Sequence, residues 1–548
     1  MAGGKEDRLK SVASETRLLL KGGLIVDGTG KKGFSGDLLI RGDKITEVSE
    51  RPIEVDCETI DCTGKVIAPG FIDVHSHMDR ILAFKGHENL KIPFTAQGCT
   101  TFVAGNCGFS AGCLTRNSKY QNQIVLDDKY TMEVSWESMA GYFDYLKEIG
   151  ITHNVINLAG NGTVRASMRG LNADHFSPEE MNDLLRRLDE AMDQGAAGVS
   201  FGLGYAPDIF CTTGEIEQVA RLVKKRDKIV TVHGRAYSLL SGSYPREKEG
   251  LPHNVLSLME MIDVARQTGV RLQYSHLMFA GSKSHQSYTQ CLEVLDQAIA
   301  DGVDVMIDTY PYHCGYSVIN VVLPPWFLAD LPANFQNDEA VERVERGLTR
   351  MPMHNGFGFE DIQIMHADHP DLTQFNGMFI SEIAEELGIS PARTILRFSE
   401  WTEGRTRILN HNYSNMEIID ALIRHPACLF MTDSTVSVEG LQNPASFGSF
   451  PLLLQYARDR NLISLEEAVR KMTGASAERL KIKDRGFLKK GLAADITVFD
   501  WGKIKDNNTV TQTDRFPTGI EAVFINGRLV KKDNELDDSA NAGMVIEI

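Results

Sequence analysis

Eight short apolar runs, each ending in polar residues, recur between residues 69 and 475 and constrain the fold more than any other feature. Helix-like stretches separate them, such as SPEEMNDLLRRLDEAMDQG, where Ser177 and Glu180 have the spacing of a capping box. Eight strand-then-helix units are typical of an α/β (β/α)8 TIM-like barrel, whose functional site forms at the carboxyl ends of the strands. We therefore predict such a barrel over 69–479. The runs are VIAPGFIDVHSH, TTFVAGNCG, THNVINLAGNG, AAGVSFGLG, KIVTVHGR, RLQYSHL, DVMIDTYPY and ACLFMTDST.

Both ends of the chain carry shorter strand-like runs. TRLLLKGGLIVDGTG and GDLLIRGDKITEVSE lie near one end, and ADITVFDWGKI and IEAVFINGRLV lie near the other. Alternating apolar residues broken by glycine-containing turns indicate antiparallel strands. We expect one small β-sandwich built from 16–68 together with 480–548, after a flexible tail over 1–15. The segment from about 330 to 405 breaks the rhythm of the barrel, and we expect an inserted lid there.

The composition excludes several classes of protein. A formal net charge of -17 repels phosphate backbones, so we expect no nucleic acid and no membrane as partner. The amino-terminal segment lacks the continuous apolar core of a secretory signal. The nine cysteines contain no CxxC pair, which favours reduced thiols in a cytoplasmic enzyme. The expected partner is a small molecule, and association into a homo-oligomer is compatible with a large acidic barrel.

The first two runs end in residues that can bind a transition metal. His75 and His77 follow an apolar strand in GFIDVHSHMD, and the period of two places both imidazoles on the same side. Two neutral imidazoles make half of a metal site. Cys107 in GNCGFS lies between glycines that leave room around its sulfur. Taken singly, the histidine pair is equally compatible with ordinary strand-end histidines, and a lone free cysteine is more often a small buried thiol.

Later runs supply the rest of a converging set. His233 ends KIVTVHGR, His276 ends RLQYSHL, and Asp433 ends ACLFMTDST. A lone strand-end histidine is more often structural, and an aspartate there is often a helix cap. Their coincidence at successive strand ends instead predicts a metal centre. A carboxylate beside a metal-bound water can take its proton and deliver it to a leaving amine, which makes Asp433 the predicted catalytic residue. The predicted metal ligands are His75, His77, Cys107, His233 and His276.

Over nearly its whole length the chain resembles the amidohydrolase superfamily, and within it the N-acyl-D-amino-acid deacylase (D-aminoacylase) family. The resemblance implies a zinc-dependent hydrolase that cleaves the amide bond of an N-acyl amino acid, of D configuration, or a related N-acyl amine. The reaction would use a metal-bound hydroxide, with Asp433 as general base and acid. The motifs that carry the resemblance are GFIDVHSH, GNCGFS, AGNGTVRASMRG, VSFGLGYAPDIFCTTGEI, VHGR, DTYPY, KMTGASAERLKIKDRGFLKKGLAADITVFD and FPTGIEAVFINGRLV.

The resemblance also assigns residues to the site. It implies a tighter zinc held by Cys107, His233 and His276, and a weaker second position at His75 and His77. Arg235 and Tyr312 stand where the family has substrate-binding pocket residues, and we expect Tyr205 or a backbone N–H to help stabilise the oxyanion.

Two positions depart from the family pattern. Met278 stands where the family usually has a basic residue, and Asn443-Pro444-Ala445 replaces a His-Pro-Arg-like motif. Both basic residues help hold the substrate carboxylate, a charge-assisted contact worth about 1.5–3 kcal/mol. Their loss weakens the expectation of a free amino-acid product and of D selectivity. Lys283 or His285 are the candidates to replace them.

Two other functions compete with this interpretation. A cyclic-amide hydrolase of the dihydropyrimidinase or hydantoinase kind shares the fold and the HxH motif, but normally relies on a bridging carbamylated lysine. No lysine lies at a comparable strand end, and Cys107 would take that place. A non-enzymatic scaffold with this fold would typically have lost metal ligands, whereas all six candidate positions hold competent residues.

Overall fold

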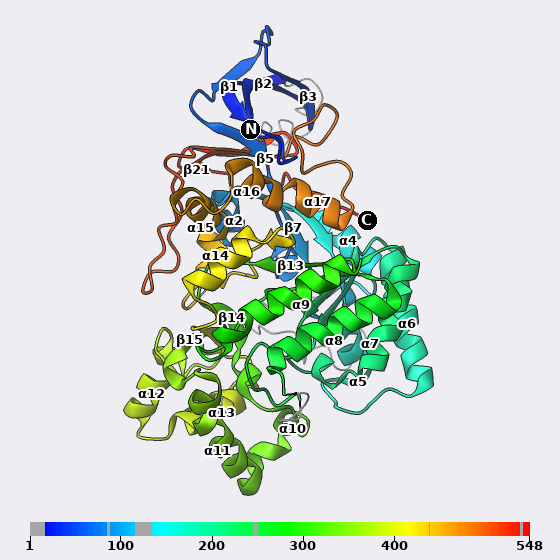
Figure 1. Ribbon diagram of the computed structural model, residues 1–548, viewed down its shortest axis with the longest axis vertical. Coiled ribbons are helices and arrows are strands. Elements are labelled where there is room, and N and C mark those ends of the chain that lie inside the picture. The colour runs from blue at the N-terminus through cyan, green and yellow to red at the C-terminus, as the bar shows by residue number, and fades with distance from the viewer. Residues whose placement is uncertain (1–16, 85–87, 115–133, 245–249, 438, 538–540) are drawn as a thin grey trace, which may run out of the picture.

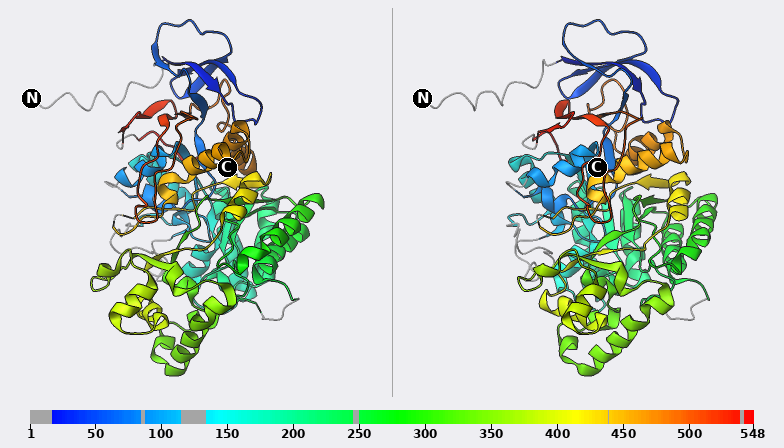
Figure 2. Two further views of the ribbon diagram at one scale, coloured as in Figure 1. Left: turned by 60° about the vertical axis from the view of Figure 1, so that its left-hand side comes forward. Right: turned by 90° about the vertical axis from the view of Figure 1, so that its left-hand side faces the viewer.

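Three parts of the molecule follow one another along its long axis. The computed structural model describes residues 17–84, 88–114, 134–244, 250–437, 439–537 and 541–548, so the expected tail over 1–15 lies outside the described residues. A sheet domain made from both ends of the chain lies at the top of Figure 1, a barrel lies in the middle, and an inserted module lies at the bottom. Figure 2 shows the same order from two other sides.

The barrel consists of β6 (Phe71–Asp73), β7 (Cys99–Ala104), β8 (Asn154–Asn157), β9 (Ala159–Gly160), β10 (Gly198–Gly202), β11 (Ile229–His233), β12 (Arg271–Tyr274), β13 (Val305–Thr309) and β17 (Cys428–Phe430). Its strands are parallel and pair in the orders β6-β7-β8 and β9-β10-β11-β12-β13-β17. Because only Leu158 separates β8 from β9, these two form one strand position. A parallel bridge between Ser76 and Ser434 joins the ends of β6 and β17 and closes the ring. All eight predicted strand positions are therefore present, in chain order.

Helices cover the outside of this barrel. In α6, Ser177 accepts a hydrogen bond from the Glu180 amide and the predicted capping box is complete. This helix buries Met181, Leu184 and Leu188, which lie on one face at helical spacing. The barrel helices are α1 (Asp79–Leu82), α2 (Ile92–Ala96), α4 (Met139–Ile149), α5 (Asn161–Arg169), α6 (Pro178–Asp193), α7 (Thr213–Lys225), α8 (His253–Thr268), α9 (Tyr288–Ala300), α14 (Met416–Arg424), α15 (Ala445–Asp459), α16 (Leu465–Met472) and α17 (Gly474–Leu480).

The two ends of the chain together form one sheet domain. Its strands are β1 (Arg17–Ile25), β2 (Phe34–Arg41), β3 (Lys44–Ser49), β4 (Glu58–Asp61), β5 (Val66–Pro69), β18 (Ile496–Phe499), β19 (Ile520–Ile525), β20 (Arg528–Lys532) and β21 (Glu535–Leu536). They are joined in a single nine-stranded sheet, in which β5 pairs antiparallel with β18. Leu20, Ile40, Ile67 and Ile496 belong to one apolar cluster, the core of this domain.

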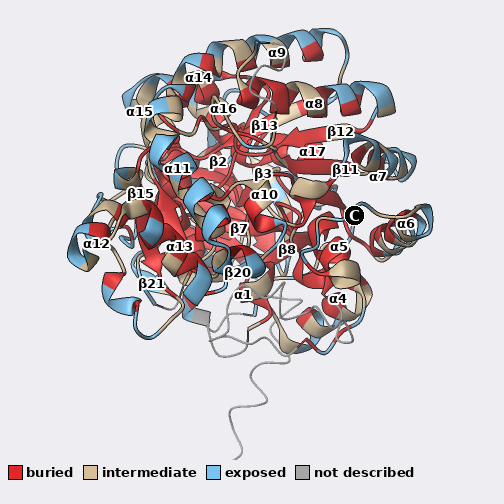
Figure 3. Cartoon of the chain, turned by 90° about the horizontal axis from the view of Figure 1, so that it is seen from below, coloured by how far each residue is buried: buried red, intermediate tan, exposed pale blue. Residues whose placement is uncertain are grey.

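The inserted module lies between β13 and α14. It contains β14 (Gly315–Val318), α10 (Pro325–Leu328), α11 (Asp338–Asn355), β15 (Ile362–His366), α12 (Ile380–Leu387), α13 (Pro391–Trp401) and β16 (Arg407–Asn410). Its elements extend beyond the expected range of 330–405 at both ends, because β14 pairs with β16 across the module. Seen from below, α10 and α11 lie in front of the barrel (Figure 3). Of the helices that the structure describes, none has the length and apolarity needed to cross a bilayer.

A buried ion pair lies where the sheet domain meets the barrel. The guanidinium of Arg485 pairs with Asp495, and the side chains of both are almost completely buried. The Asp495 carboxylate also accepts hydrogen bonds from Asn154 Nδ2 of β8 at 2.9 Å and from the Asn526 amide at 2.7 Å. Burial raises the pKa of Asp495, and the charge of Arg485 opposes this rise. The Asp495 carboxyl group thus depends on the charge of Arg485 to stay ionised while buried.

We predict that Arg485→Met lowers the free energy of unfolding by about 3–5 kcal/mol, because it leaves Asp495 buried without its partner. The loss should be smaller in acid, since the raised pKa of Asp495 allows the folded variant to take up a proton. Thermal unfolding at pH 5 and pH 8 measures both effects. Arg460→Met removes a more exposed ion pair with Asp420 and should change stability by less than about 1 kcal/mol. Equal losses in the two variants would contradict the prediction.

Candidate metal centre

The structure brings together all six side chains that the sequence predicted for the centre. His75 and His77 follow β6, Cys107 follows β7, and His233 ends β11. Because parallel barrel strands all end on the same face, their carboxyl-terminal residues face a common cavity. The cavity lining includes five of the six residues, and the sixth, His75, is fully buried beside them; the five are His77, Cys107, His233, His276 and Asp433.

Three of these residues have a backbone conformation that L-amino acids seldom adopt. The φ angles are 55° at Cys107, 33° at His276 and 47° at Asp433. Positive φ outside glycine costs about 1–3 kcal/mol and is concentrated at functional sites. Hydrogen bonds hold each one in place. The Tyr205 hydroxyl donates to the Cys107 carbonyl at 3.0 Å, the His276 amide donates to Asp308 at 2.6 Å, and the Asp433 amide donates to the His75 carbonyl at 2.9 Å.

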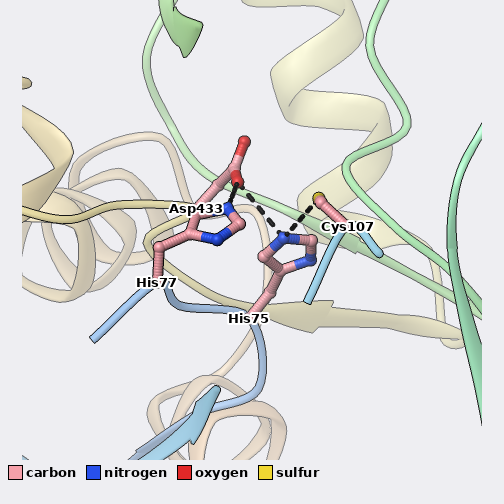
Figure 4. A group of neighbouring side chains, drawn as sticks. All are labelled: His75, His77, Cys107 and Asp433. Carbon is pink, nitrogen blue, oxygen red and sulfur yellow. Dashed lines mark hydrogen bonds and ion pairs between the residues drawn. The ribbon is translucent and has the colours of Figure 1, made fainter. Parts of the chain in front are cut away.

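One group of donor atoms surrounds His75. Its Nε2 lies 3.2 Å from Cys107 Sγ and 3.2 Å from Asp433 Oδ1. His77 Nε2 lies 3.3 Å from the same carboxylate oxygen. Figure 4 shows the two imidazoles and the thiol directed toward one another and toward the carboxylate. The donor atoms of these four residues all lie within 4.8 Å of one another.

A second group shares Cys107 with the first. Cys107 Sγ lies 3.5 Å from His276 Nε2 and 3.9 Å from His233 Nδ1, and these two nitrogens are 3.0 Å apart. These three donors again lie within 4.8 Å of one another. Nitrogen and sulfur donors with a carboxylate oxygen are the ligand types that zinc takes in proteins. The arrangement fits two neighbouring metal positions bridged by one thiolate.

Charge is distributed unevenly over the centre. Burial would raise the pKa of Cys107, but the charge of His75 and hydrogen bonds from His233 and His276 hold it well below its usual value. Burial also opposes ionisation of Asp433, yet the charges of His276 and His75 keep its pKa well below the usual range. For His77, burial favours the neutral ring, but Asp433 and Cys107 raise its pKa to about 9. A thiolate and a carboxylate thus attract positive charge, which a metal cation would supply.

Asp308 of β13 supports the centre from inside the barrel, and the sequence analysis did not identify it. Its carboxylate lies 3.9 Å from His75 Nδ1 and accepts a hydrogen bond from Gln273 at 2.8 Å. Gln273 in turn accepts one from Arg479 at 3.2 Å. The same carboxylate accepts from the His276 amide, so it contacts residues of both donor groups. The one local sign of this role is an acidic residue inside an otherwise buried strand, VMIDT.

The expected substrate-binding residues lie in different places. Tyr205 lines the cavity, and its ring centroid is 4.8 Å from that of His233. Arg235 also lines the cavity, but its guanidinium pairs with Glu260 at 3.1 Å. Tyr312 is not among the described residues that line the cavity, and its hydroxyl donates to Asp506 at 2.9 Å. The structure thus brings two of the three to the cavity.

Of the two positions that depart from the family pattern, one lines the cavity and the other does not. Met278 lines the cavity, and its sulfur lies 3.6 Å from the Tyr310 hydroxyl. Ala445 lies in α15 and is not among the described lining residues. Lys283 donates to the Met353 carbonyl, and His285 contacts the Asn412 carbonyl at 3.4 Å; neither lines the cavity within the described chain. The proposed replacements for the missing basic pair therefore do not reach the centre in this conformation.

Gly204 leaves the space in which the His233 ring lies. A Cβ atom at this position would come within 2.6 Å of His233 Nε2. We predict that Gly204→Ala displaces the ring and weakens divalent metal binding by about 10- to 100-fold, the usual effect of disturbing the support of a ligand. Competition with a chelator measures the affinity. Gly347→Ala, where no atom lies within 4 Å of the added Cβ, should bind metal as the unmodified protein does. Unchanged affinity in Gly204→Ala would exclude His233 as a ligand.

Comparison with known proteins identifies similar chains. A model of the amidohydrolase family matches residues 58–531. The N-acyl-D-aspartate deacylase of Alcaligenes xylosoxydans xylosoxydans is 27% identical over 547 residues, covering 98% of this chain and 96% of the relative. The D-aminoacylase of the same organism is 28% identical, with 96% and 97% of the two chains covered. The crystal structure of the N-acyl-D-glutamate deacylase from Bordetella bronchiseptica, complexed with zinc and a phosphonate inhibitor, has the same fold: the TM-score is 0.78 at 24% identity, over 98% of this chain and 100% of that one.

Proposed function

The chain belongs to the amidohydrolase family, and from this premise we propose that it is a zinc-dependent hydrolase that cleaves the amide bond of an N-acyl amino acid, of D configuration, or a related N-acyl amine. The observation that carries the proposal is the pair of donor groups that share Cys107 at the carboxyl end of the barrel. Relatives named for deacylation of N-acyl-D-amino acids cover almost the whole chain, which supports the same bond type.

Two sets of residues would hold the metal. Cys107, His233 and His276 form the tighter position in this proposal, and His75 and His77 form a second, weaker one that shares Cys107. When bound, zinc supplies a Lewis acid that polarises the amide carbonyl and lowers the pKa of a water. The zinc in the N-acyl-D-glutamate deacylase structure supports this choice of ion.

Asp433 is the proposed proton carrier of the reaction. Its pKa lies well below the usual range, because His276 and His75 stabilise the ionised form against burial. An ionised carboxylate accepts a proton from the attacking water and then delivers it to the amine nitrogen as the amide bond breaks. Burial raises the pKa of Tyr205, so its phenol stays protonated. Its one O–H donates to the Cys107 carbonyl, and it would have to leave this acceptor to donate to the oxyanion.

The competing functions have less support. A cyclic-amide hydrolase of the hydantoinase kind would use a bridging lysine, and none of the described residues that line the cavity is a lysine. A scaffold without activity would have no need to retain strained backbone at Cys107, His276 and Asp433. The donor groups therefore favour hydrolysis of an open-chain amide.

We predict that Asp433→Asn retains zinc but loses about 10²- to 10⁴-fold in kcat/KM, because the proton carrier is removed while the Cys107, His233 and His276 donors remain. The assay is amine release from N-acetyl-D- and N-acetyl-L-amino acids and their carboxamides. Asp420→Asn, which replaces an aspartate paired with Arg460, should keep the rate of the unmodified protein. A near-normal rate in Asp433→Asn would contradict the assigned role. Release from the carboxamides but not from the acids would show that the pocket does not require a carboxylate.

Zinc binding should release protons near neutral pH. The pKa of His77 is raised to about 9 in the metal-free centre, so its ring is protonated at pH 7, and a ligating imidazole must be neutral. We therefore predict that zinc affinity falls as the pH drops below about 9. Calorimetry in two buffers of different ionisation enthalpy counts the protons. His77→Asn should release about one proton fewer when zinc binds. Equal proton release in the two proteins would exclude His77 as a ligand that loses its proton to bind zinc.

The thiols bear on the compartment. All nine cysteines are free, and eight of them are buried. Unpaired thiols persist in reducing compartments, which favours the cytoplasm as the site of action. The expected partner there is a small N-acyl substrate. Light scattering measures whether the chain forms a homo-oligomer.

A further inference from the structure

We propose that the inserted module binds the acyl group of the substrate, and that this group is a hydrocarbon chain longer than acetyl. The inference rests on the proposed hydrolysis of an N-acyl bond and names the class of acyl group. It places the chain against the surface formed by Val318, Val321, Val322, Trp326, Phe335 and Met351, called here the apolar wall.

The cavity is larger than a short N-acyl amino acid needs. Its volume is about 1660 Å³, whereas small-molecule sites usually enclose roughly 300–1,000 Å³. One continuous space reaches from His77 and Asp433 at the metal centre to Trp326 and Arg343 in the module. The extra volume therefore belongs to the cavity that contains the metal centre and not to a separate pocket.

The apolar wall faces this space. Val321, Val322 and Trp326 are half-buried and line the cavity, and they rest on the core of the module. Behind them, Ile319 and Phe327 are fully buried and do not belong to the described lining. The wall is thus a second apolar layer that the module's own core does not cover. A contiguous apolar surface of this kind marks a binding site for an apolar group.

The backbone of the wall offers little to a polar ligand. Pro324 and Pro325 lie between Val322 and Trp326 and line the cavity, and proline has no N–H to donate. The guanidinium of Arg343 covers the Trp326 ring at 4.1 Å from its centroid, and Phe327 meets that ring edge-on at 5.6 Å. Trp326 is therefore held in place. A hydrocarbon chain matches this surface because it needs no hydrogen bonds.

Asn410, Tyr413 and Tyr310 line the same cavity and can fix the orientation of the substrate. Asn410 is 1% exposed and donates to the Tyr413 hydroxyl at 2.6 Å, while its Oδ1 has no hydrogen-bond partner among the described residues. Burial, and after it the charge of Asp433, raises the pKa of both Tyr413 and Tyr310. A donor on the amine part of the substrate would satisfy Asn410. The amine part then lies near Asp433, and the acyl chain extends toward the module.

Binding to a hydrolysis-deficient protein tests this separately from turnover. Zinc-loaded Asp433→Asn is titrated calorimetrically with N-acetyl-, N-hexanoyl- and N-decanoyl-D-leucine. Each methylene that is fully buried strengthens binding by about fourfold, so we expect N-hexanoyl-D-leucine to bind at least about tenfold more tightly than the N-acetyl compound. N-acetyldecylamine carries its hydrocarbon chain on the nitrogen, and it should bind no more tightly than N-acetyl-D-leucine.

Two tryptophans of the module provide a matched comparison. Trp326→Ala, in the Asp433→Asn protein, should weaken the binding of the N-decanoyl compound by about tenfold. It should weaken the binding of the N-acetyl compound by less than about twofold. Trp401 belongs to α13, is 40% exposed and is not among the described lining residues, so Trp401→Ala should leave both affinities unchanged. Val322→Ser is a second, smaller change in the wall, and it should reduce the gain per methylene. The melting temperature of each variant checks its folding.

The outcomes separate the two proposals. Affinity that does not depend on acyl length, together with hydrolysis by the unmodified protein, would overturn the acyl site and leave the proposed function standing. Affinity that rises with length and is lost in Trp326→Ala, without hydrolysis of any N-acyl compound, would support the wall and overturn the proposed function. An equal gain for N-acetyldecylamine would place the chain on the amine side and overturn the assignment to the acyl group.

Discussion

The seam between β6 and β17 is the contact on which the metal centre depends. These strands are separated by most of the chain, and closing the barrel brings them side by side. Thr432 donates its amide and its hydroxyl to Asp73 at 3.0 and 2.6 Å. Beyond this point the Asp433 amide donates to the His75 carbonyl, and the His77 amide donates to the Ser434 carbonyl at 3.0 Å. The catalytic candidate and the HxH motif are therefore fixed relative to each other by backbone, not by flexible side chains.

Asp73 shows what this seam requires. Burial raises its pKa to about 7, although Thr432 and the His75 amide stabilise its charge. A carboxyl group with so little solvent is accommodated because its two oxygens accept hydrogen bonds from both sides of the seam. Because the seam fixes the backbone, the donor residues need only local changes of conformation to reach their positions. Positive φ at Asp433 is supported by the hydrogen bond from its amide to the His75 carbonyl, so the ring closure offsets the strain at this residue.

Local pattern and long-range pairing explain which features could be predicted from the sequence. The eight barrel strands and the six donor residues carry their own signals, because each strand is an apolar run and five of the eight runs end in donor residues. The boundaries of the module carry no such signal. β14 pairs with β16 across almost the whole insertion, and the residues near Gly315 do not predict that pairing. Asp308 was missed for a similar reason, since its partners His75, Gln273 and Arg479 come from distant segments. Tyr312 was placed by resemblance alone, and in the structure its hydroxyl contacts Asp506.

The two functional surfaces of the cavity follow different physical rules. At the barrel end, donor atoms must lie within a few tenths of an ångström of workable positions, and strands with fixed register provide this. At the module, dispersion and solvent exclusion act on area and not on direction, so helices and turns with half-buried side chains suffice. A change in the module can therefore alter which acyl group binds without moving a metal ligand. Conversely, Met278 lies where the two surfaces meet, packed on the cores of both barrel and module. A thioether there is apolar and adaptable, so shape and the unpaired acceptor of Asn410 would contribute to selectivity at this point.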